Sequence, residues 1–494
     1  MRSDRGVRLT VDLKKKTVNS ILWSVARVGW TTLSSFVLFV VLTRLLDPVA
    51  FGLFALCSTF VEFARVLASA GLSDAVTREE HLSEEMADTA FWSNLGFSVV
   101  VVLLVLVCAG PYARFMGQPG LVPILFALSP LMVLGALHSI HNARLLRDFG
   151  HKAVALRTVG VTVAASGLAI GAAFLGWGVW SLVVQAAVTE VVTTVFTWRL
   201  YRWVPKFRFS VPALKKLLGF SFSMVLTQML WVLLGRMPEI FIGRYLGAAE
   251  VGRYRIAWRL IDLLAQSVLG PIGSVGLVTL SRVQSDLPRF QKIYAQISAS
   301  AALLTFPLML GFGAVADELI PLVFGPQWRG NGDLVRVLAL MVVPFTVNYF
   351  TAPALAAVGQ SRSILKVASL QLVLTLLFSW IAAPYGLAAI ALAYVIRANV
   401  TMPYQLWVLQ KHTGVNAMAS LKAMLPPLLM SIVMAVATYF AAPYIQAWLV
   451  RPWPAMLALV AFGGALYGVM LFVFAREQVR AVFEVLLPKL RKTP

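Results

Sequence analysis

Two sets of charged and polar side chains interrupt long apolar stretches of the chain. In each set, successive members are separated by four, three and four residues, so that all of them lie on one stripe of a helix. The sets are Ser58, Glu62, Arg65 and Ser69, and Arg255, Arg259, Asp262 and Gln266. Guanidinium groups hold phosphate and carboxylate through paired, charge-assisted hydrogen bonds. The two stripes therefore predict an anion-binding surface rather than a catalytic centre.

Arginine exceeds acid among the side chains deep inside the apolar stretches. These arginines are Arg27, Arg65, Arg255, Arg259 and Arg397, and the acids are Glu62, Glu190 and Asp262. A guanidinium facing lipid at that depth costs at least about 2.5 kcal/mol, so we expect these groups to face a protein-lined or wet interior. The excess predicts a cationic chamber that binds an anionic head group, with Gln266 as a further polar group.

The same residues support a plainer interpretation. Glu62 with Arg65, and Arg259 with Asp262, lie three residues apart and could form ion pairs that only hold the helices together. The three acids are also the candidates for coupling to H⁺ or Na⁺. No metal site is predicted, because His138 and His141 have no carboxylate or cysteine partner nearby in the sequence.

The composition identifies the membrane as the solvent. The 494 residues are 59% hydrophobic and 13% charged, with a mean hydropathy of +0.81. Soluble domains are about 25% charged, so an ordinary soluble enzyme is excluded. Cys57 and Cys108 are the only cysteines, which excludes a disulfide framework. No nucleotide-binding loop or nucleophile elbow occurs, and no cofactor is predicted.

Fourteen apolar stretches are long enough to cross the roughly 30 Å hydrocarbon core as helices. They are residues 18–42, 51–72, 90–109, 121–140, 153–175, 177–198, 217–243, 251–280, 293–315, 334–357, 367–383, 385–409, 423–444 and 454–475. With the basic tail 1–17 in the cytoplasm, only five basic residues fall in the opposite loops: Arg44, Arg114, Arg244, Arg329 and Arg451. This asymmetry places both termini in the cytoplasm and accounts for most of the net charge of +21 without nucleic acid.

The chain resembles itself at an offset of 200 residues. T-R-L-L-D-P-V-A-F-G-L-F at 43–54 aligns with G-R-Y-L-G-A-A-E-V-G-R-Y at 243–254, and Gly52 falls on Gly252. Six spans in each copy give both the same orientation, as parallel repeats around a central cavity. The predicted parts are a basic tail, an N-terminal lobe, a C-terminal lobe, two accessory helices and a second basic tail: 1–17, 18–216, 217–422, 423–475 and 476–494.

Three segments carry a family resemblance that extends over essentially the whole chain. With T-R-L-L-D-P-V-A-F-G-L-F-A-L from residue 43, G-W-G-V-W-S-L-V-V-Q from 176 and I-G-R-Y-L-G-A-A-E-V-G-R-Y from 242, the chain resembles the Wzx-like polysaccharide flippases. These form a branch of the multidrug/oligosaccharidyl-lipid/polysaccharide exporter superfamily. One departure is G-R-M-P-E at 235–239, where family members more often carry an Asp-Arg pair.

The resemblance implies a transporter of the bacterial inner membrane that works by alternating access. Its substrate would be a polyprenyl-diphosphate-linked oligosaccharide, exported to the periplasmic leaflet for lipopolysaccharide or exopolysaccharide synthesis. Arginines of the first, second and eighth spans, here Arg27, Arg65 and Arg255 or Arg259, would line the cavity, and the last two helices would hold the lipid tail. Membrane lipids, a polysaccharide polymerase and chain-length machinery are the expected partners.

Two other classes remain open at this point. A multidrug or small-solute antiporter shares the architecture, but it typically binds cations and predicts an acid-lined cleft. A membrane polymerase or glycosyltransferase needs a sizeable loop with catalytic groups, and no loop between the predicted spans exceeds roughly twenty residues.

Overall fold

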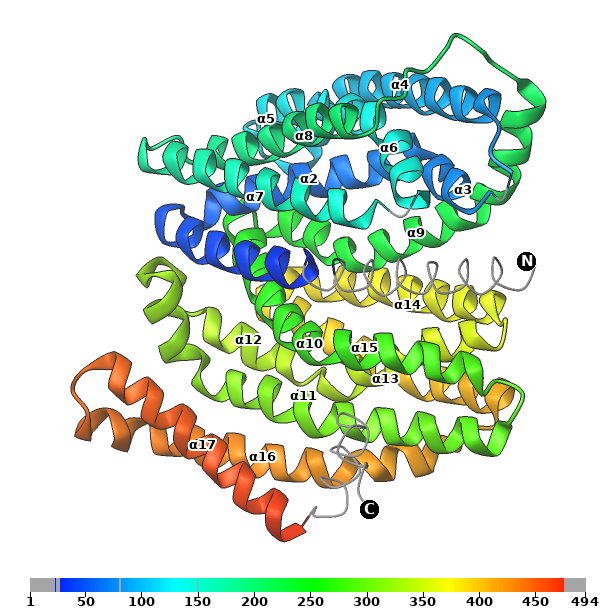
Figure 1. Ribbon diagram of the computed structural model, residues 1–494. Helices are drawn as coiled ribbons and strands as arrows, with labels where there is room; N and C mark the ends of the chain where they lie inside the picture. Colours follow the sequence, from blue (N-terminus) through cyan, green and yellow to red (C-terminus); the bar gives the residue numbers. More distant parts are fainter. Residues whose placement is uncertain (1–22, 24–26, 80, 149, 475–494) are drawn as a thin grey trace. The chain divides into compact units, whose positions relative to one another are not determined.

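The protein is an all-helical chain in the part that the structure, a computed structural model, describes: residues 23, 27–79, 81–148 and 150–474 (Figure 1). The predicted tails at 1–17 and 476–494, and the start of the first predicted span, lie outside the described residues. The chain forms two compact units, Met1–Arg236 with Gly247–Gly252, and Met237–Leu246 with Arg253–Pro494. The predicted lobe boundary at residues 216 and 217 stays a prediction.

The first unit contains the N-terminal helices and most of α9. Their bounds are Arg27–Leu45, α2 Pro48–Ser69, α3 Leu72–Arg78, α4 Glu84–Met116, α5 Leu121–Leu128, α6 Leu131–Arg147, α7 His151–Phe174, α8 Trp180–Leu200 and α9 Val211–Tyr245. Local sequence sets where helices begin: the Asp47 carboxylate accepts a hydrogen bond from the Ala50 amide at 2.7 Å, and Pro48 occupies the first turn. Ser83 caps α4 in the same way.

The second unit continues from α9 to the last helix. Its helices are α10 Ala248–Arg282, α11 Leu287–Phe324, η1 Pro326–Trp328, α12 Asn331–Ala339, α13 Val342–Ala357, α14 Ser361–Ala382, η2 Ala383–Tyr385, α15 Leu387–Thr413, α16 Ala417–Trp448 and α17 Pro452–Phe474. The first turn of α10, up to Gly252, belongs to the first unit. α11 packs against α12, α13, α16 and α17, so the two accessory helices belong to this unit.

The predicted spans are confirmed as helices throughout the described part of the chain. Twelve helices there are long and apolar enough to cross a membrane, and α12 with α13 forms a further span that is bent by 54°. α10 is not among these; it is 35 residues long and carries the second polar stripe in its first half. With α10 included, the fourteen predicted spans all correspond to helices, and the fold class is that of a polytopic all-α membrane protein.

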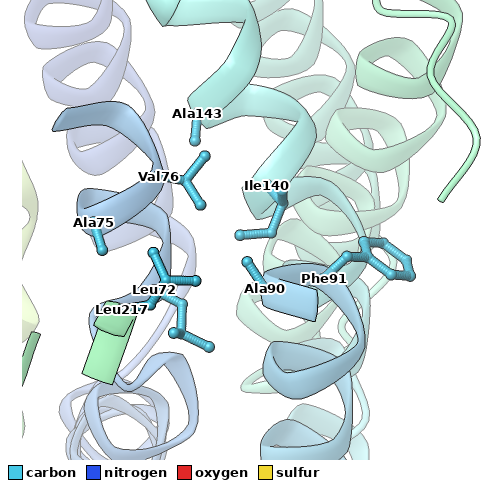
Figure 2. Close-up of a cluster of buried hydrophobic side chains, with 8 residues drawn as sticks. All are labelled: Leu72, Ala75, Val76, Ala90, Phe91, Ile140, Ala143 and Leu217. Atoms are coloured by element: carbon cyan, nitrogen blue, oxygen red, sulfur yellow. The ribbon is translucent and has the colours of Figure 1, made fainter. Parts of the chain in front are cut away.

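A cluster of buried apolar side chains joins α3, α4, α6 and α9 inside the first unit. Figure 2 shows its members: Leu72, Ala75, Val76, Ala90, Phe91, Ile140, Ala143 and Leu217. The start of α9 is also tied to α3, because the Ser221 hydroxyl donates to the Gly71 carbonyl oxygen at 3.1 Å. These contacts fix the ends of α4 and α6, which carry polar groups discussed below.

The first turns of α2 and α10 cross at backbone contact. A Cβ atom added to Gly52 would lie 1.6 Å from the Ala248 carbonyl oxygen, and one added to Gly252 would lie 2.1 Å from the Pro48 carbonyl oxygen. Residues 48 and 248, like 52 and 252, are equivalent under the offset of 200. Gly52 faces residue 248 and Gly252 faces residue 48, so the offset of 200 exchanges the two contacts. Such a reciprocal pair of contacts is expected around a local two-fold axis. This crossing supports the internal repeat.

Candidate functional site

A cavity of about 480 Å³ lies within the first unit, between α2, α8 and the junction of α5 with α6. Sites for small ligands typically measure about 300 to 1,000 Å³. The polar side chains of its lining come from α2 and α8, and they are Ser58, Glu62, Arg65, Gln185, Thr189 and Glu190. Three members of the first predicted stripe therefore share one cavity, whereas the Ser69 hydroxyl bonds to the Val66 carbonyl oxygen within its own helix.

Both carboxylates of this cavity are paired with arginine, although not as the short-range interpretation of the sequence predicted. Arg65 Nη1 lies 2.8 Å from Glu190 Oε1, which joins α2 to α8. Glu62 Oε2 accepts instead from Arg236 Nε of α9, at 3.0 Å. The predicted pairing of Glu62 with Arg65 is wrong, because Arg65 extends to the neighbouring helix rather than along its own.

The lining of this cavity within the first unit contains no excess of arginine, and the cationic central chamber stays a prediction. The lining contains one arginine and two glutamates, and Arg236 from outside the lining neutralises Glu62. An anion entering this cavity must therefore compete with Glu190 for the Arg65 guanidinium. The two partners differ in exposure, since 49% of the Arg65 side chain and 12% of the Glu190 side chain are accessible. The arginine is thus the partner that can reorient.

Glu190 is held in place by α6 and by its own helix. The Thr194 hydroxyl donates to the Glu190 carbonyl oxygen at 2.8 Å and lies 3.2 Å from His138 Nδ1. Gly135 faces the carboxylate, because a Cβ atom there would lie 3.7 Å from Glu190 Oε2. His138 is thus part of the helix packing around Glu190. No cluster of three potential metal ligands occurs among the described residues.

Arg27 and Arg157 form a second positively charged region in the first unit. Their guanidinium groups are close enough to repel each other electrostatically, and neither has an ion-pair partner among the described residues. Arg157 Nη1 donates to the Thr197 hydroxyl at 2.6 Å, which fixes it against α8. Both side chains are partly buried. Two adjacent cations without a carboxylate are a suitable partner for a divalent anion.

In the second unit, Arg255 is bound to a buried glutamate. Its Nε donates to Glu239 Oε1 at 2.9 Å, its Nη2 contacts Glu239 Oε2, and only 1% of the Glu239 side chain is exposed. This pair gives a role to the G-R-M-P-E segment that departs from the family pattern, because Glu239 of this segment neutralises Arg255 of α10. Arg255 therefore forms an ion pair that joins α9 and α10 in this unit.

The other predicted site residues of the second unit differ in their burial. Arg397 is buried on α15, its guanidinium carbon lies 4.2 Å from the centre of the Tyr394 ring, and its Nε has no hydrogen-bond partner among the described residues. Arg259 and Gln266 are exposed on α10, and no described carboxylate forms an ion pair with Arg259. The predicted pairing of Arg259 with Asp262 is therefore not observed.

Several of these polar groups were not singled out in the sequence. Arg157 lies near the start of the predicted span 153–175, and Gln185 and Thr189 lie in a stretch dominated by apolar residues. Spacing offered a signal for two of them. Thr189 and Glu190 follow Gln185 by four and five residues, which places the three side chains on one side of a helix. No local signal links Arg236 to Glu62, since the pair is 174 residues apart.

Comparison with known proteins agrees with this architecture. A family model described as "Polysaccharide biosynthesis protein" matches residues 41–333. The chain is 26% identical to the succinoglycan biosynthesis transport protein ExoT of Rhizobium meliloti (strain 1021), over 96% of both chains. It is 22% identical to the lipopolysaccharide biosynthesis protein WzxC of Escherichia coli (strain K12), over 67% of this chain and 68% of WzxC.

Among solved structures, the fold is similar to that of the lipid II flippase MurJ in an inward closed conformation. The TM-score is 0.73 at 14% identity, over 93% of this chain and all of that one. An inward-facing multidrug resistance transporter of the MATE family matches with a TM-score of 0.63 at 19% identity, over 78% of this chain and 95% of the other. These likenesses concern the fold alone.

The fold and the relatives define a multi-pass membrane transporter rather than an enzyme. The family match covers more than half of the chain, and the chain belongs to this family of polysaccharide biosynthesis proteins. The resemblance that the sequence motifs predicted is thereby confirmed.

Proposed function

We propose that the protein is a flippase for an oligosaccharide linked to polyprenyl diphosphate. It moves this substrate from the cytoplasmic to the periplasmic leaflet of a bacterial inner membrane, where the glycan enters lipopolysaccharide or exopolysaccharide. The names of the relatives support this class of substrate, because they are a succinoglycan transport protein and a lipopolysaccharide biosynthesis protein. A polysaccharide polymerase and chain-length machinery are the partners we expect on the periplasmic side of the membrane.

The observation that carries the proposal is the pair of unneutralised arginines, Arg27 and Arg157, in the same unit as the cavity. A diphosphate diester carries two negative charges and several acceptor oxygens, which suits two neighbouring guanidinium groups. A cationic drug would instead need a free carboxylate. Glu62 and Glu190 are both paired with arginine, so neither carboxylate of this cavity is free to hold a cation.

Binding and release can be coupled through the Arg65–Glu190 ion pair. A diphosphate that reaches the cavity competes with Glu190 for Arg65, and the displaced carboxylate is left without its cation. When the diphosphate leaves, Glu190 recovers Arg65. This exchange gives Glu190 a role in H⁺ coupling and keeps Arg65 from holding the substrate too tightly. Glu62 and Asp262 are further candidates for coupling to H⁺ or Na⁺.

The membrane potential favours transport in this direction. Moving one charge through the potential is worth about 2.3 kcal/mol per 100 mV, and a diphosphate carries two charges. Expelling the anion from a negative interior is therefore downhill by about 4.6 kcal/mol per 100 mV. The site has only to expose the head group alternately to the two sides of the membrane. This orientation, with both termini in the cytoplasm, is part of the proposal.

Polymer export in cells tests the proposal. Arg27→Gln and Arg157→Gln each remove one cation, and a charge-assisted hydrogen bond is worth about 1.5–3 kcal/mol, or roughly a 10- to 150-fold loss of affinity. We expect either variant to reduce export strongly at unchanged protein level. Arg114→Gln is the matched control, because Arg114 is exposed at the end of α4 and has no ion-pair partner among the described residues. Full export by the double variant at normal protein level would refute the assignment.

A further inference from the structure

Residues 201–210, hereafter the strap, connect α8 to α9 without forming a helix. The strap reads Y-R-W-V-P-K-F-R-F-S, so basic residues alternate with aromatic and aliphatic ones. A loop of this kind would ordinarily carry polar side chains, because connecting segments face water. Its composition and its position between two long helices raise the question of what it contacts.

The backbone of the strap is fixed by side chains from α4. Asp88 Oδ1 accepts a hydrogen bond from the Lys206 amide at 3.0 Å, and Trp92 Nε1 donates to the Lys206 carbonyl oxygen at 2.9 Å. The Thr89 hydroxyl oxygen accepts from the Ser210 amide, also at 3.0 Å. Asp88 and Thr89 are buried. These contacts hold one end of the strap in a single conformation.

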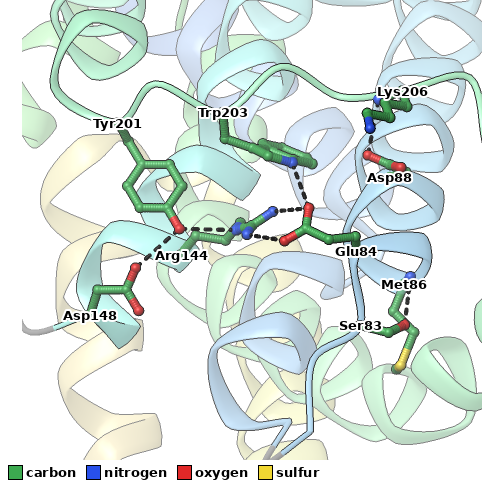
Figure 3. A network of polar contacts seen from close by, with 9 residues as sticks. All are labelled: Ser83, Glu84, Met86, Asp88, Arg144, Asp148, Tyr201, Trp203 and Lys206. Atoms are coloured by element: carbon green, nitrogen blue, oxygen red, sulfur yellow. Dashed lines mark hydrogen bonds and ion pairs between the residues drawn. The ribbon is translucent and has the colours of Figure 1, made fainter.

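The other end of the strap is held by α6 and by the start of α4 (Figure 3). Trp203 Nε1 donates to Glu84 Oε2 at 3.0 Å, and its carbonyl oxygen lies 2.9 Å from His141 Nε2. Arg144 binds both oxygens of Glu84, at 2.6 and 3.0 Å, and its guanidinium carbon lies 4.6 Å from the centre of the Trp203 ring. The Tyr201 hydroxyl donates to Asp148 Oδ2 at 3.0 Å.

With its backbone fixed in this way, the strap directs three of its large apolar side chains outward. Phe207 is 90% exposed, Val204 73% and Phe209 57%. Phe207 stacks on Trp92 with ring centres 4.5 Å apart, which adds a second aromatic surface. The basic residues Arg202, Lys206 and Arg208 are exposed on the same segment. The result is a surface that is both apolar and cationic.

The position of the strap along α4 is that of a membrane interface. α4 has 33 residues and is about 50 Å long, whereas the hydrocarbon core is roughly 30 Å thick, so its ends extend into the head-group layers. Trp92 lies about 12 Å from the first residue of the helix. Trp198 and Trp203 pack on Phe91 at this level, as in the aromatic belt of membrane proteins.

We propose that the strap binds anionic phospholipid in the head-group layer of the membrane. Arg202, Lys206 and Arg208 contact the lipid phosphates, and Phe207 and Phe209 enter the boundary of the acyl chains. Charge complementarity favours lipid as the occupant, because basic and aromatic residues together suit an anionic membrane surface. A protein partner that adds a strand would need free backbone groups, and the amides of Lys206 and Ser210 are already used. The strap then fixes the depth in the membrane of the segment that connects the two sequence repeats.

The depth of the strap in a bilayer is the first test. Phe207→Cys in a Cys108→Ser background carries a nitroxide, and the purified full-length protein is placed in vesicles of phosphatidylcholine with phosphatidylglycerol. We expect oxygen to relax the label more strongly than a water-soluble nickel complex does, at a depth of about 5–10 Å. Glu85→Cys, on an exposed position of α4, is the aqueous control. A label at 207 that is as accessible to nickel as the one at 85 overturns the proposal.

The choice of lipid is the second test. Spin-labelled phosphatidylglycerol is compared with spin-labelled phosphatidylcholine for association with the protein. Replacing the three strap cations Arg202, Lys206 and Arg208 by Gln should lower the preference for phosphatidylglycerol by up to about fivefold per residue at low salt. The matched control replaces three exposed basic residues at the end of α10 and the start of α11: Arg282, Arg289 and Lys292. Equal losses in both triple variants, or immobilisation of the label at 207 only by added protein, would overturn the proposal.

Discussion

The crossing of α2 and α10 gives the prediction with the clearest geometric basis. Gly52→Ala places a methyl group 1.6 Å from the Ala248 carbonyl oxygen, and an ordinary contact needs at least about 3.4 Å. The two backbones must separate by nearly 2 Å, since a carbonyl group cannot rotate away as the end of a flexible side chain can. Overpacking of this kind costs about 1–3 kcal/mol, and more where the backbone resists. Gly252→Ala requires a smaller shift, because its clash is at 2.1 Å.

Melting of the purified protein in detergent measures this effect. We expect Gly52→Ala to lower the melting temperature more than Gly252→Ala does, and the double variant to lose less than the sum because both methyl groups act on one contact. Gly96→Ala is the matched control in a helix of the same unit. Nothing lies within 4 Å of a Cβ atom there, and the change should gain up to about 1 kcal/mol from helix propensity. Equal melting of Gly52→Ala and wild type would refute the reasoning.

Three further changes test the ion pairs. Glu190→Gln frees Arg65 from its ion pair, so a short-chain fluorescent polyprenyl-diphosphate sugar should bind about tenfold more tightly and dissociate more slowly. Unchanged binding would contradict the competition between Glu190 and the diphosphate for Arg65. Glu239→Gln removes the carboxylate that neutralises Arg255 and should destabilise the protein by about 3–5 kcal/mol in thermal melts, whereas adding Arg255→Met should restore most of the loss. The Lys216 ammonium, 2.9 Å from Glu79, lowers the pKa of that carboxyl, so the contact is lost as pH falls through this lowered pKa. Lys216→Gln should raise the pKa of Glu79 towards about 4.3 in NMR titrations, and an unchanged pKa would show that the contact is absent in solution.

The sequence predicts the helices well because their signal is local. Asp47 and Pro48 mark the start of α2, and the apolar stretches have the length that the membrane requires. The helices extend beyond most predicted spans, since helix ends continue into the head-group layers, where hydropathy gives no signal. α12 and α13 show the limit of this reasoning: the sequence predicts one span at 334–357, whereas the structure bends it by 54°.

The partners of the charged residues could not be predicted from the sequence. Spacing placed Glu62 and Arg65 on one face of α2, which is confirmed by their shared cavity. It could not identify which helices lie beside that face, so the contacts with Arg236 and Glu190 were missed. Those contacts join residues 174 and 125 positions apart, and periodicity carries no information over such distances.

The arginine count also needed the fold for its interpretation. Arg255 was assigned to substrate binding, yet Glu239 holds it in an ion pair, and a departure from the family pattern was the only sequence signal for that contact. Arg157 was not among the arginines singled out in the sequence. In the fold it interacts electrostatically with Arg27, and its charge is not neutralised by any described carboxylate.

Flipping by the purified protein in proteoliposomes tests the central claim most directly. The two substrates carry the same short glycan, attached to the lipid through a diphosphate or through a monophosphate, and wild type is compared with the Arg27→Gln/Arg157→Gln double variant. We predict that wild type flips the diphosphate substrate faster and that the double variant loses this preference. Equal rates for both substrates in wild type, or an unchanged preference in the double variant, would contradict the assignment of these arginines to a diphosphate in transit.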